Sequence, residues 1–110
     1  MDKHFIEEGK RCINFNDKDG LEKLTISIQD YIDESKIIIN FQNIYQKLFL
    51  HACQTHSKEC IKYLLNLYFN KFDIVTKIAL RQLFYYGKYL MKDKQLKKWY
   101  DISVIALIKA

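Results

Sequence analysis

The sequence of 110 residues contains no proline and only three glycines. Because proline interrupts helices and glycine destabilises their interiors, this scarcity favours long helices over turn-rich β structure. The longest aliphatic runs, residues 37–39 and 104–108, are far shorter than the ~20 residues of a membrane-spanning helix. With 49% hydrophobic residues, the chain has enough apolar side chains for one core. We therefore expect residues 1–110 to form a single all-α domain that makes no use of a membrane.

Cysteine is scarce and odd in number, since only Cys12, Cys53 and Cys60 are present. Disulfide frameworks of small secreted domains use even numbers of cysteines. The first residues, Met1–His4, also lack the charged and then apolar pattern of a signal peptide. We therefore expect reduced thiols in an intracellular protein, either cytoplasmic or nuclear.

A zinc site is the alternative role for two of the cysteines. Cys53, His56 and Cys60 are three and four residues apart, so on one continuous helix they would share a face. His51 would supply a fourth ligand. The polar residues 55–57 instead predict a turn that separates these side chains. Free cysteine packs as a small apolar residue, so we interpret the cysteines as buried structural residues and expect neither a metal nor another cofactor.

Signals of catalysis are equally few. No glycine-rich phosphate-binding loop is present, and the only histidines are His4, His51 and His56. None of them stands in a recognisable arrangement with a nucleophile and a carboxylate. Glycine-poor helical hairpins also offer few loops on which an active site can be built. We therefore expect a protein that is not an enzyme.

Apolar residues recur at intervals of three and four along most of the chain, which is typical of amphipathic helices. Polar residues at 14–19 and 55–57 interrupt this pattern, and Asp73 and Asp93 are suitable N-caps. The pattern predicts three helical hairpins in series, which cover residues 3–33, 44–69 and 74–109.

Three segments allow more detailed expectations. Residues 44–54 are apolar on more than one side, so this helix should lie in the middle of the protein. In residues 35–43, the β-branched Ile37–Ile39 suit an extended connector or a short strand. Residues 74–91 should form one helix, whose buried side should carry Val75, Ile78, Ala79, Leu83, Tyr86 and Leu90.

The middle hairpin carries a motif that resembles the ankyrin repeat. Residues 52–65 read Ala-Cys-Gln-Thr-His-Ser-Lys-Glu-Cys-Ile-Lys-Tyr-Leu-Leu. The family reads Ala-Ala/Cys-x-x-Gly-His-x-Glu-Ile-Val-Lys-x-Leu-Leu across the turn between its two helices. Ala52 and Cys53 match the small pair that lets the two helices approach closely. His56 stands where the family has glycine, and both the Thr-Pro-Leu-His entry and the hairpin finger of the family are missing.

A weaker echo of the motif lies at residues 78–88, close to one family period further on. It puts Gly87 where the glycine of the inter-helix turn belongs, although Leu83 and Phe84 are bulkier than the family's small pair. One such hairpin cannot bury its apolar face alone, whereas about three stacked hairpins can. The resemblance therefore implies a short ankyrin-like solenoid, and the residues alone leave a compact helical bundle as the alternative.

The resemblance also implies a non-catalytic protein–protein interaction module. Ankyrin proteins contact their partners mainly through the first helix of each pair. Those contact positions, carried onto this chain, are His51, Gln54, Thr55, Gln82, Tyr85 and Tyr86.

The amino-acid composition points to an origin for the protein. Lysine heavily outnumbers arginine, and Ile and Asn are plentiful, which is typical of the low-GC genomes of parasites and large DNA viruses. We therefore expect a viral or parasite factor that binds a host protein.

The net charge of +5 is unevenly distributed. Residues 1–36 hold six basic and nine acidic residues (−3), residues 37–70 hold three and one (+2), and residues 71–110 hold nine and three (+6). Such polarity can attract an acidic partner or a polyanion. It can also consist merely of lysines that solvate exposed helix faces.

The basic end of the chain supports an alternative function, a small basic helical protein that binds nucleic acid through residues 77–100. Cations bind phosphate and aromatic rings stack on bases. The cations of this face are Arg81, Lys88, Lys92, Lys94, Lys97 and Lys98. Against this alternative, Tyr86, Trp99 and Tyr100 fall on stripes that we expect to be buried, and a single arginine is poorly suited to base readout.

Overall fold

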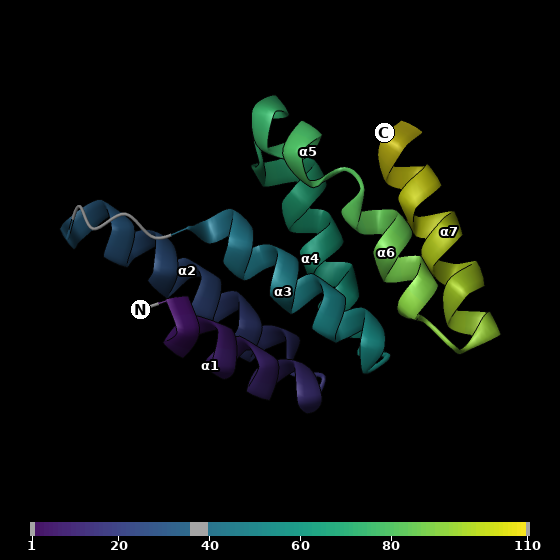
Figure 1. The fold of residues 1–110 in the computed structure, drawn as a ribbon, viewed down its shortest axis with the longest axis horizontal. Coiled ribbons are helices and arrows are strands. Elements are labelled where there is room, and N and C mark those ends of the chain that lie inside the picture. Colours follow the sequence, from purple (N-terminus) through teal and green to yellow (C-terminus); the bar gives the residue numbers. More distant parts are fainter. Residues whose placement is uncertain (1, 36–39, 110) are drawn as a thin grey trace.

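The computed structural model describes residues 2–35 and 40–109, and all regular structure in these ranges is helical. Seven helices follow one another along the described chain (Figure 1): α1 (Asp2–Asn14), α2 (Lys18–Ser35), α3 (Phe41–Gln54), α4 (Lys58–Lys71), α5 (Ile74–Leu80), α6 (Leu83–Leu90) and α7 (Lys94–Lys109). These residues contain no strand. The prediction of an all-α protein is therefore confirmed.

The first four helices pack as two hairpins, and α6 and α7 are joined by side-chain contacts. α1 packs on α2, and α3 packs on α4. α6 is tied to α7, because the Tyr100 hydroxyl donates to the Phe84 carbonyl at 3.0 Å and Lys88 pairs with Asp101 at 2.9 Å. Across the hairpins, α3 contacts both α1 and α6, while α4 contacts both α2 and α7. Helices α1, α3 and α6 therefore form one row, with α3 in the middle (Figure 1), and α2, α4 and α7 form a second row.

The first two hairpins agree with the predicted bounds to within a few residues. The turn between α1 and α2 falls inside the predicted segment 14–19, and residues 55–57 separate α3 from α4. α3 begins at Phe41, so the last part of the ambiguous segment 35–43 is helical rather than extended. Ile37–Ile39 lie outside the described residues.

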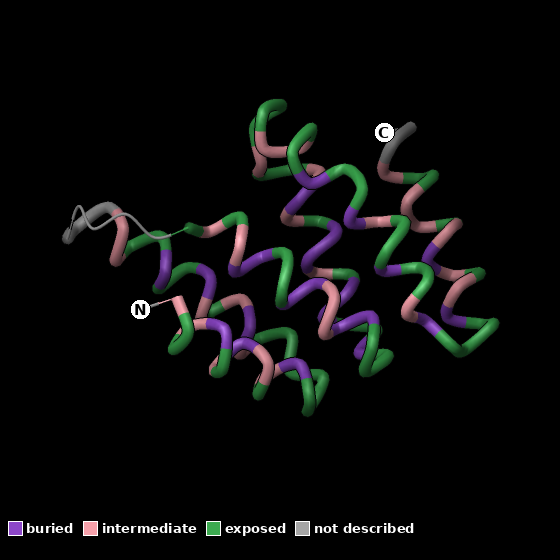
Figure 2. The backbone as a smooth tube through the Cα atoms, in the orientation of Figure 1, coloured by how far each residue is buried: buried purple, intermediate pink, exposed green. Residues whose placement is uncertain are grey.

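The core is centred on α3, as its apolar composition predicted. The buried residues of this helix are Ile44, Tyr45, Leu48, Phe49, Ala52 and Cys53. Figure 2 shows this buried surface running along α3, between its neighbours. The hydroxyl of Tyr45 donates to the Leu64 carbonyl of α4 at 2.6 Å, so the one polar atom of this buried ring is paired.

Two glycines let the neighbouring helices approach α3 closely. A Cβ atom added to Gly9 of α1 would lie 2.5 Å from Cδ2 of Leu48, and one added to Gly87 of α6 would lie 2.7 Å from Cε1 of Phe49. Both distances are below van der Waals contact, so with a larger residue at either position the facing side chain or the helix itself would have to shift. Each flank of α3 therefore has a glycine at its point of closest contact.

The turns of the first two hairpins share one unusual conformation. Asn16 and His56 have positive φ angles of 51° and 58°, the only such values among the described non-glycine residues. Both turns also carry equivalent backbone hydrogen bonds, since Asp17 N donates to Cys12 O and Ser57 N donates to Ala52 O. Asparagine tolerates the left-handed region better than most residues. The glycine position of the resembled motif is thus occupied by a left-handed His56.

The side chains of these two turn residues bind the next hairpin. The Asn16 amide oxygen accepts from the backbone N–H groups of Glu59 and Cys60 at 3.1 and 3.4 Å, in the first turn of α4. His56 Nε2 accepts from the backbone N–H of Lys92 at 3.1 Å. In return, the Ser57 hydroxyl donates to the Ile13 carbonyl at 2.7 Å. Each turn is therefore fastened to its successor by polar contacts as well as by apolar packing.

The prediction of one helix over residues 74–91 is wrong. α5 ends at Leu80 and α6 begins at Leu83, with Arg81 and Gln82 forming a turn between them. Both turn residues keep right-handed helical backbone angles (φ −57°, ψ −34° and φ −72°, ψ −14°). Because no proline or glycine marks the break, the local sequence contains no signal that predicts it.

The predicted buried side of this segment is also wrong in large part. Val75, Ile78 and Tyr86 are exposed, with 71%, 58% and 61% of their surface accessible. Ala79 is exposed as well, whereas Leu83 is buried as predicted, together with Leu80 and Gly87. Both sides of the segment are apolar, and close packing of Gly87 on α3 selects the side that is buried.

The echo of the ankyrin motif at residues 78–88 is out of register. Gly87 lies inside α6 rather than in a turn, and the chain reverses only after Leu90. α7 then begins at Lys94, where the Asp93 side chain accepts from the backbone N–H groups of Gln95 and Leu96 at 2.8 and 3.2 Å. Asp93 thus caps the last helix as predicted.

Candidate functional site

Helices α5 and α6 expose a set of large apolar side chains that no described residue covers. The set consists of Ile74, Val75, Ile78, Tyr85, Tyr86 and Tyr89. We call it the α5–α6 stripe, because its members recur at helical spacing on the side opposite Leu80, Leu83 and Gly87. Tyr89 and Tyr85 are the most accessible, at 85% and 78%. Large exposed apolar patches on soluble proteins often mark interaction sites, so the stripe is the candidate binding surface.

The helices that carry the stripe are held firmly on their other side. The Tyr68 hydroxyl donates to the Lys77 carbonyl, and the Lys77 ammonium donates to the Phe69 carbonyl at 3.0 Å. Asp73 caps α5, because its carboxylate accepts from the Thr76 N–H at 2.8 Å. This hydrogen bond lowers the pKa of Asp73. The stripe is therefore displayed by a fixed scaffold.

The charge around the stripe is basic because cations outnumber acidic groups in this part of the chain, nine to three in residues 71–110. Residues 71–110 contain only three acidic side chains. Asp73 and Asp93 cap helices, and Asp101 pairs with Lys88. Among the described residues, no ion pair engages the exposed cations Arg81, Lys92, Lys94 and Lys98. The surface around the stripe thus attracts negative charge.

The predicted contact residues of the middle hairpin lie at the end of α3. His51 is half-buried, and its Nε2 lies 2.7 Å from the Asn14 amide oxygen of α1. Partial burial, with a smaller effect of Lys10, lowers the pKa of His51. The Thr55 hydroxyl donates to the His51 carbonyl at 2.9 Å and lies 2.8 Å from the Ser57 hydroxyl. Only Gln54 is exposed and without such a structural contact.

Gln54 borders a shallow groove between α1 and α3, which also includes Lys3, Glu7 and Lys47. The predicted residues of the third hairpin lie on α6, which packs against the other flank of α3. Tyr85 and Tyr86 are exposed there, and Gln82 precedes the helix in the turn after α5. The structure therefore leaves five of the six predicted positions exposed, and it uses half-buried His51 and exposed Thr55 for internal hydrogen bonds.

The alternative basic face is less continuous than the sequence suggested. Lys88 is paired with Asp101, and Lys97 is half-buried. Tyr100 is buried and binds α6, as expected, and Trp99 is covered by the Lys58 ammonium 5.1 Å from its ring centre. The accessible rings of this end of the chain are thus those of α6.

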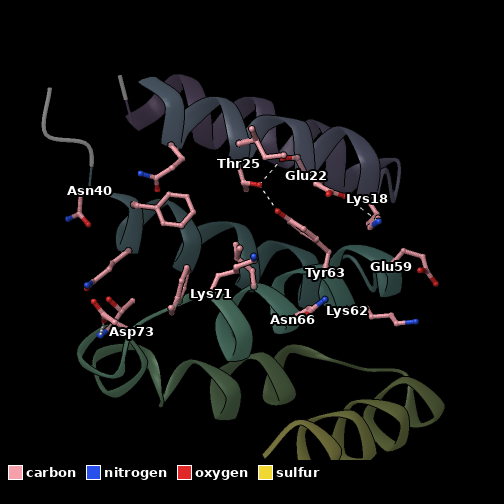
Figure 3. Close-up of a pocket in the computed structure, with 17 residues that line it drawn as sticks. Lys18, Glu22, Thr25, Asn40, Glu59, Lys62, Tyr63, Asn66, Lys71 and Asp73 are labelled. Atoms are coloured by element: carbon pink, nitrogen blue, oxygen red, sulfur yellow. Dashed lines mark hydrogen bonds and ion pairs between the residues drawn. The ribbon is translucent and has the colours of Figure 1, made fainter. Parts of the chain in front are cut away.

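A wider groove lies between α2 and α4 (Figure 3). Its lining includes the half-buried rings of Phe41, Tyr63 and Phe72. The hydroxyls of Thr25 and Tyr63 lie 2.5 Å apart and join the two helices across it. Charges of both signs line its edge, and the described residues leave no buried polar side-chain atom without a hydrogen bond.

The cysteines are separated as the turn at residues 55–57 predicted. Cys53 lies in α3 and Cys60 in α4, and both are buried. Burial raises the pKa of Cys53 to about 12 and that of Cys60 to about 11. Among the described residues, no three His, Cys, Asp or Glu side chains are grouped so that they could hold a metal.

The burial of Cys53 and Cys60 predicts that Cys12 reacts with thiol reagents before them. At pH 8 the half-buried Cys12 should react first with an aromatic disulfide reagent, because a raised pKa and burial both suppress the reactive thiolates of Cys53 and Cys60. All three should react at once in guanidinium. A strong chelator should not change the native rates; faster labelling of Cys53 and Cys60 after chelation would mean that a bound metal had protected them.

Comparison with known proteins gives no relative. No protein-family model, curated protein or solved structure matches the chain. None of the described helices is long and apolar enough to cross a membrane.

Sequence reasoning missed three members of the α5–α6 stripe as surface residues. Ile74 was not singled out, and Val75 and Ile78 were assigned to the core. The signal that could have found them is the apolar character of residues 74–90 on two opposite sides, because a helix at the end of a stack can bury only one of them.

Proposed function

We propose that the protein is a non-catalytic protein–protein interaction module built as a short ankyrin-like stack of hairpins. The observation that carries this proposal is the α5–α6 stripe, whose six large side chains are each more than half exposed on rigid helices. Tyrosines are frequent anchors at protein interfaces, since each buries a large area with one polar tip. The amino-acid composition, which is typical of a low-GC genome, supports a viral or parasite factor whose partner is a host protein.

Two structural features support the comparison with stacked repeats. The first two hairpins have the same left-handed turn, and each turn binds the next hairpin through Asn16 or His56. The central helix has a close glycine contact on each flank, through Gly9 and Gly87. Stacks of this kind act by rigid display, because neighbouring repeats hold one another in place while exposed residues select the partner.

Nucleic-acid binding is the second candidate, and one observation favours it. Tyr86, which we expected in the core, is exposed beside Tyr85 and Tyr89. Three accessible rings near Arg81 and Lys92 could stack on unpaired bases. This function predicts a steep loss of affinity for generic DNA or RNA as salt increases, whereas an apolar protein interface tolerates salt.

Affinity capture from host-cell lysate tests the proposed function. Tyr85→Ala and Gln54→Ala should fold normally, because both side chains are exposed, and should each weaken capture of the same protein by ~1–3 kcal/mol if they are anchors. Lys23→Ala, on the exposed surface of α2, is the matched control and should bind as wild type. Retained proteins are compared by quantitative mass spectrometry.

Two other results of the capture experiment would contradict the proposed function. If both variants capture the partner like wild type while charge reversal of Lys94, Lys97 and Lys98 abolishes capture, the binding surface is the basic face. If nuclease treatment of the lysate removes all captured proteins, the protein binds nucleic acid.

A further inference from the structure

We infer that the α5–α6 stripe binds an amphipathic α-helix whose apolar side is bordered by acidic residues. This inference deepens the proposed function, on which it rests, by naming the chemistry of the partner. It follows from the shape of the exposed set, from the charges around it and from the recognition modes that the described fold offers.

The spacing of the stripe suits a helix. Ile74 and Ile78 are four residues apart on α5, as are Tyr85 and Tyr89 on α6, so each pair forms a ridge along its helix. Ridges of this kind pack into the grooves of another helix. Helix-on-helix contact is also how the described fold is built, since α3 packs between α1 and α6. A partner helix on the stripe would extend the same packing outward.

This surface is poorly suited to the other common modes of peptide recognition. Strand addition needs a free sheet edge, and the described residues form no strand. A proline-rich peptide needs a groove between aromatic rings, whereas the aliphatic Ile74, Val75 and Ile78 make up half of the stripe. An apolar helical ridge laid along α5 and α6 uses both the aliphatic and the aromatic members.

The charges specify the rim of the partner. All three acidic side chains of this end of the chain are engaged in caps or in the pair between Lys88 and Asp101. Arg81, which lies between the two parts of the stripe, and Lys92, which follows α6, are exposed and unpaired among the described residues. Glutamate or aspartate beside the apolar anchors would meet these cations, whereas lysine would be repelled.

Three synthetic peptides of about 18 residues, or five helical turns, test this inference on the full chain. The first carries leucine at helical i, i+3, i+4 and i+7 spacing with glutamate beside the leucines. The second has lysine in place of glutamate, and the third is a shuffled version of the first without the apolar stripe. Fluorescence anisotropy should show the first peptide binding at least about tenfold more tightly than either control.

Substitutions locate the binding site. The double variant Ile78→Ser/Tyr89→Ser should weaken binding of the glutamate peptide by about tenfold or more, and Arg81→Glu should weaken it while improving binding of the lysine peptide. Ile26→Ser, an exposed apolar residue on α2, is the matched control and should have no effect. Circular dichroism of each variant checks that helix content is unchanged.

Four outcomes would overturn the inference. If the glutamate and lysine peptides bind equally well, the stripe does not select an acidic helix. If the double variant Ile78→Ser/Tyr89→Ser binds the glutamate peptide like wild type, the peptide does not bind at the stripe. Stripe-dependent binding to phosphatidylcholine/phosphatidylserine vesicles without a peptide preference assigns the stripe to a lipid surface. Stripe-dependent self-association in analytical ultracentrifugation assigns it to a second copy.

The results of the peptide test and of the lysate test distinguish a failure of the acidic-helix inference from a failure of the proposed function. A host protein whose capture depends on Tyr85, combined with no peptide preference, keeps the interaction module and overturns the acidic helix. Peptide binding as expected, combined with no Tyr85-dependent protein in the lysate, overturns the proposed host partner instead.

Discussion

Gly87→Val should destabilise the protein by about 3 kcal/mol, a large part of the ~5–15 kcal/mol of a typical domain. A Cβ at this position would lie 2.7 Å from Cε1 of Phe49 and 2.9 Å from Sγ of Cys53. Both neighbours are completely buried, so neither can move aside. α6 must therefore shift away from α3, and the loss should appear as a lower midpoint in urea unfolding with an unchanged slope.

The effect of Gly87→Ala on stability is more diagnostic than that of Gly87→Val, because the expected sign is opposite to that in an exposed helix. In an exposed helix interior, alanine in place of glycine stabilises by ~1 kcal/mol, whereas here the clash should reverse the sign. The control is Tyr89→Val in the same helix, where the side chain is 85% exposed and the change should be small. Phe49→Leu removes the clashing ring atom, so Gly87→Ala should cost less in that background. A Gly87→Ala protein more stable than wild type would show that α6 does not approach α3 this closely.

Asn16→Ala should cost about 2 kcal/mol although the residue is fully on the surface. Two effects combine: alanine is strained at a φ of 51° by ~1 kcal/mol, and the first turn of α4 loses its hydrogen-bond acceptor, which costs another ~1 kcal/mol. Ser57 stands at the N-cap of α4 but makes no capping hydrogen bond. The first hairpin therefore caps the second, so the damage should spread to α4.

Asn16→Gly separates the two effects, because glycine adopts positive φ freely but has no side-chain acceptor. It should cost about half as much as Asn16→Ala, and both should speed amide hydrogen exchange at Glu59 and Cys60. Exposed Lys23→Ala is the control. If exchange at these two amides is unchanged in Asn16→Ala, the contact between the hairpins does not contribute to stability.

The candidate surface was predictable only in part. Tyr85, Tyr86, Gln54 and Gln82 came from the resemblance to ankyrin repeats and are accessible in the structure. The aliphatic members of the α5–α6 stripe were assigned to the core, because apolar residues at helical spacing usually point inward. Exposure of Ile74 at 72% depends on which hairpin is last in the described stack, and periodicity does not contain that information.

The sequence by itself determined the all-α class, the first two hairpins and the central place of α3. These follow from local causes: the absence of proline, apolar spacing of three and four residues, and polar turns at residues 14–19 and 55–57. The break at Arg81 and Gln82 carries no such signal, since both residues retain helical backbone angles.

Tertiary structure decided which side of α5 and α6 is buried. Both sides are apolar, so the hydrophobic effect alone does not choose between them. The choice is made by shape, because only the side with Gly87 lets α6 approach Phe49 and Cys53 of α3. Rotation of a helix about its own axis depends on residues that are distant in the chain, and here it leaves three tyrosines, Tyr85, Tyr86 and Tyr89, on the surface.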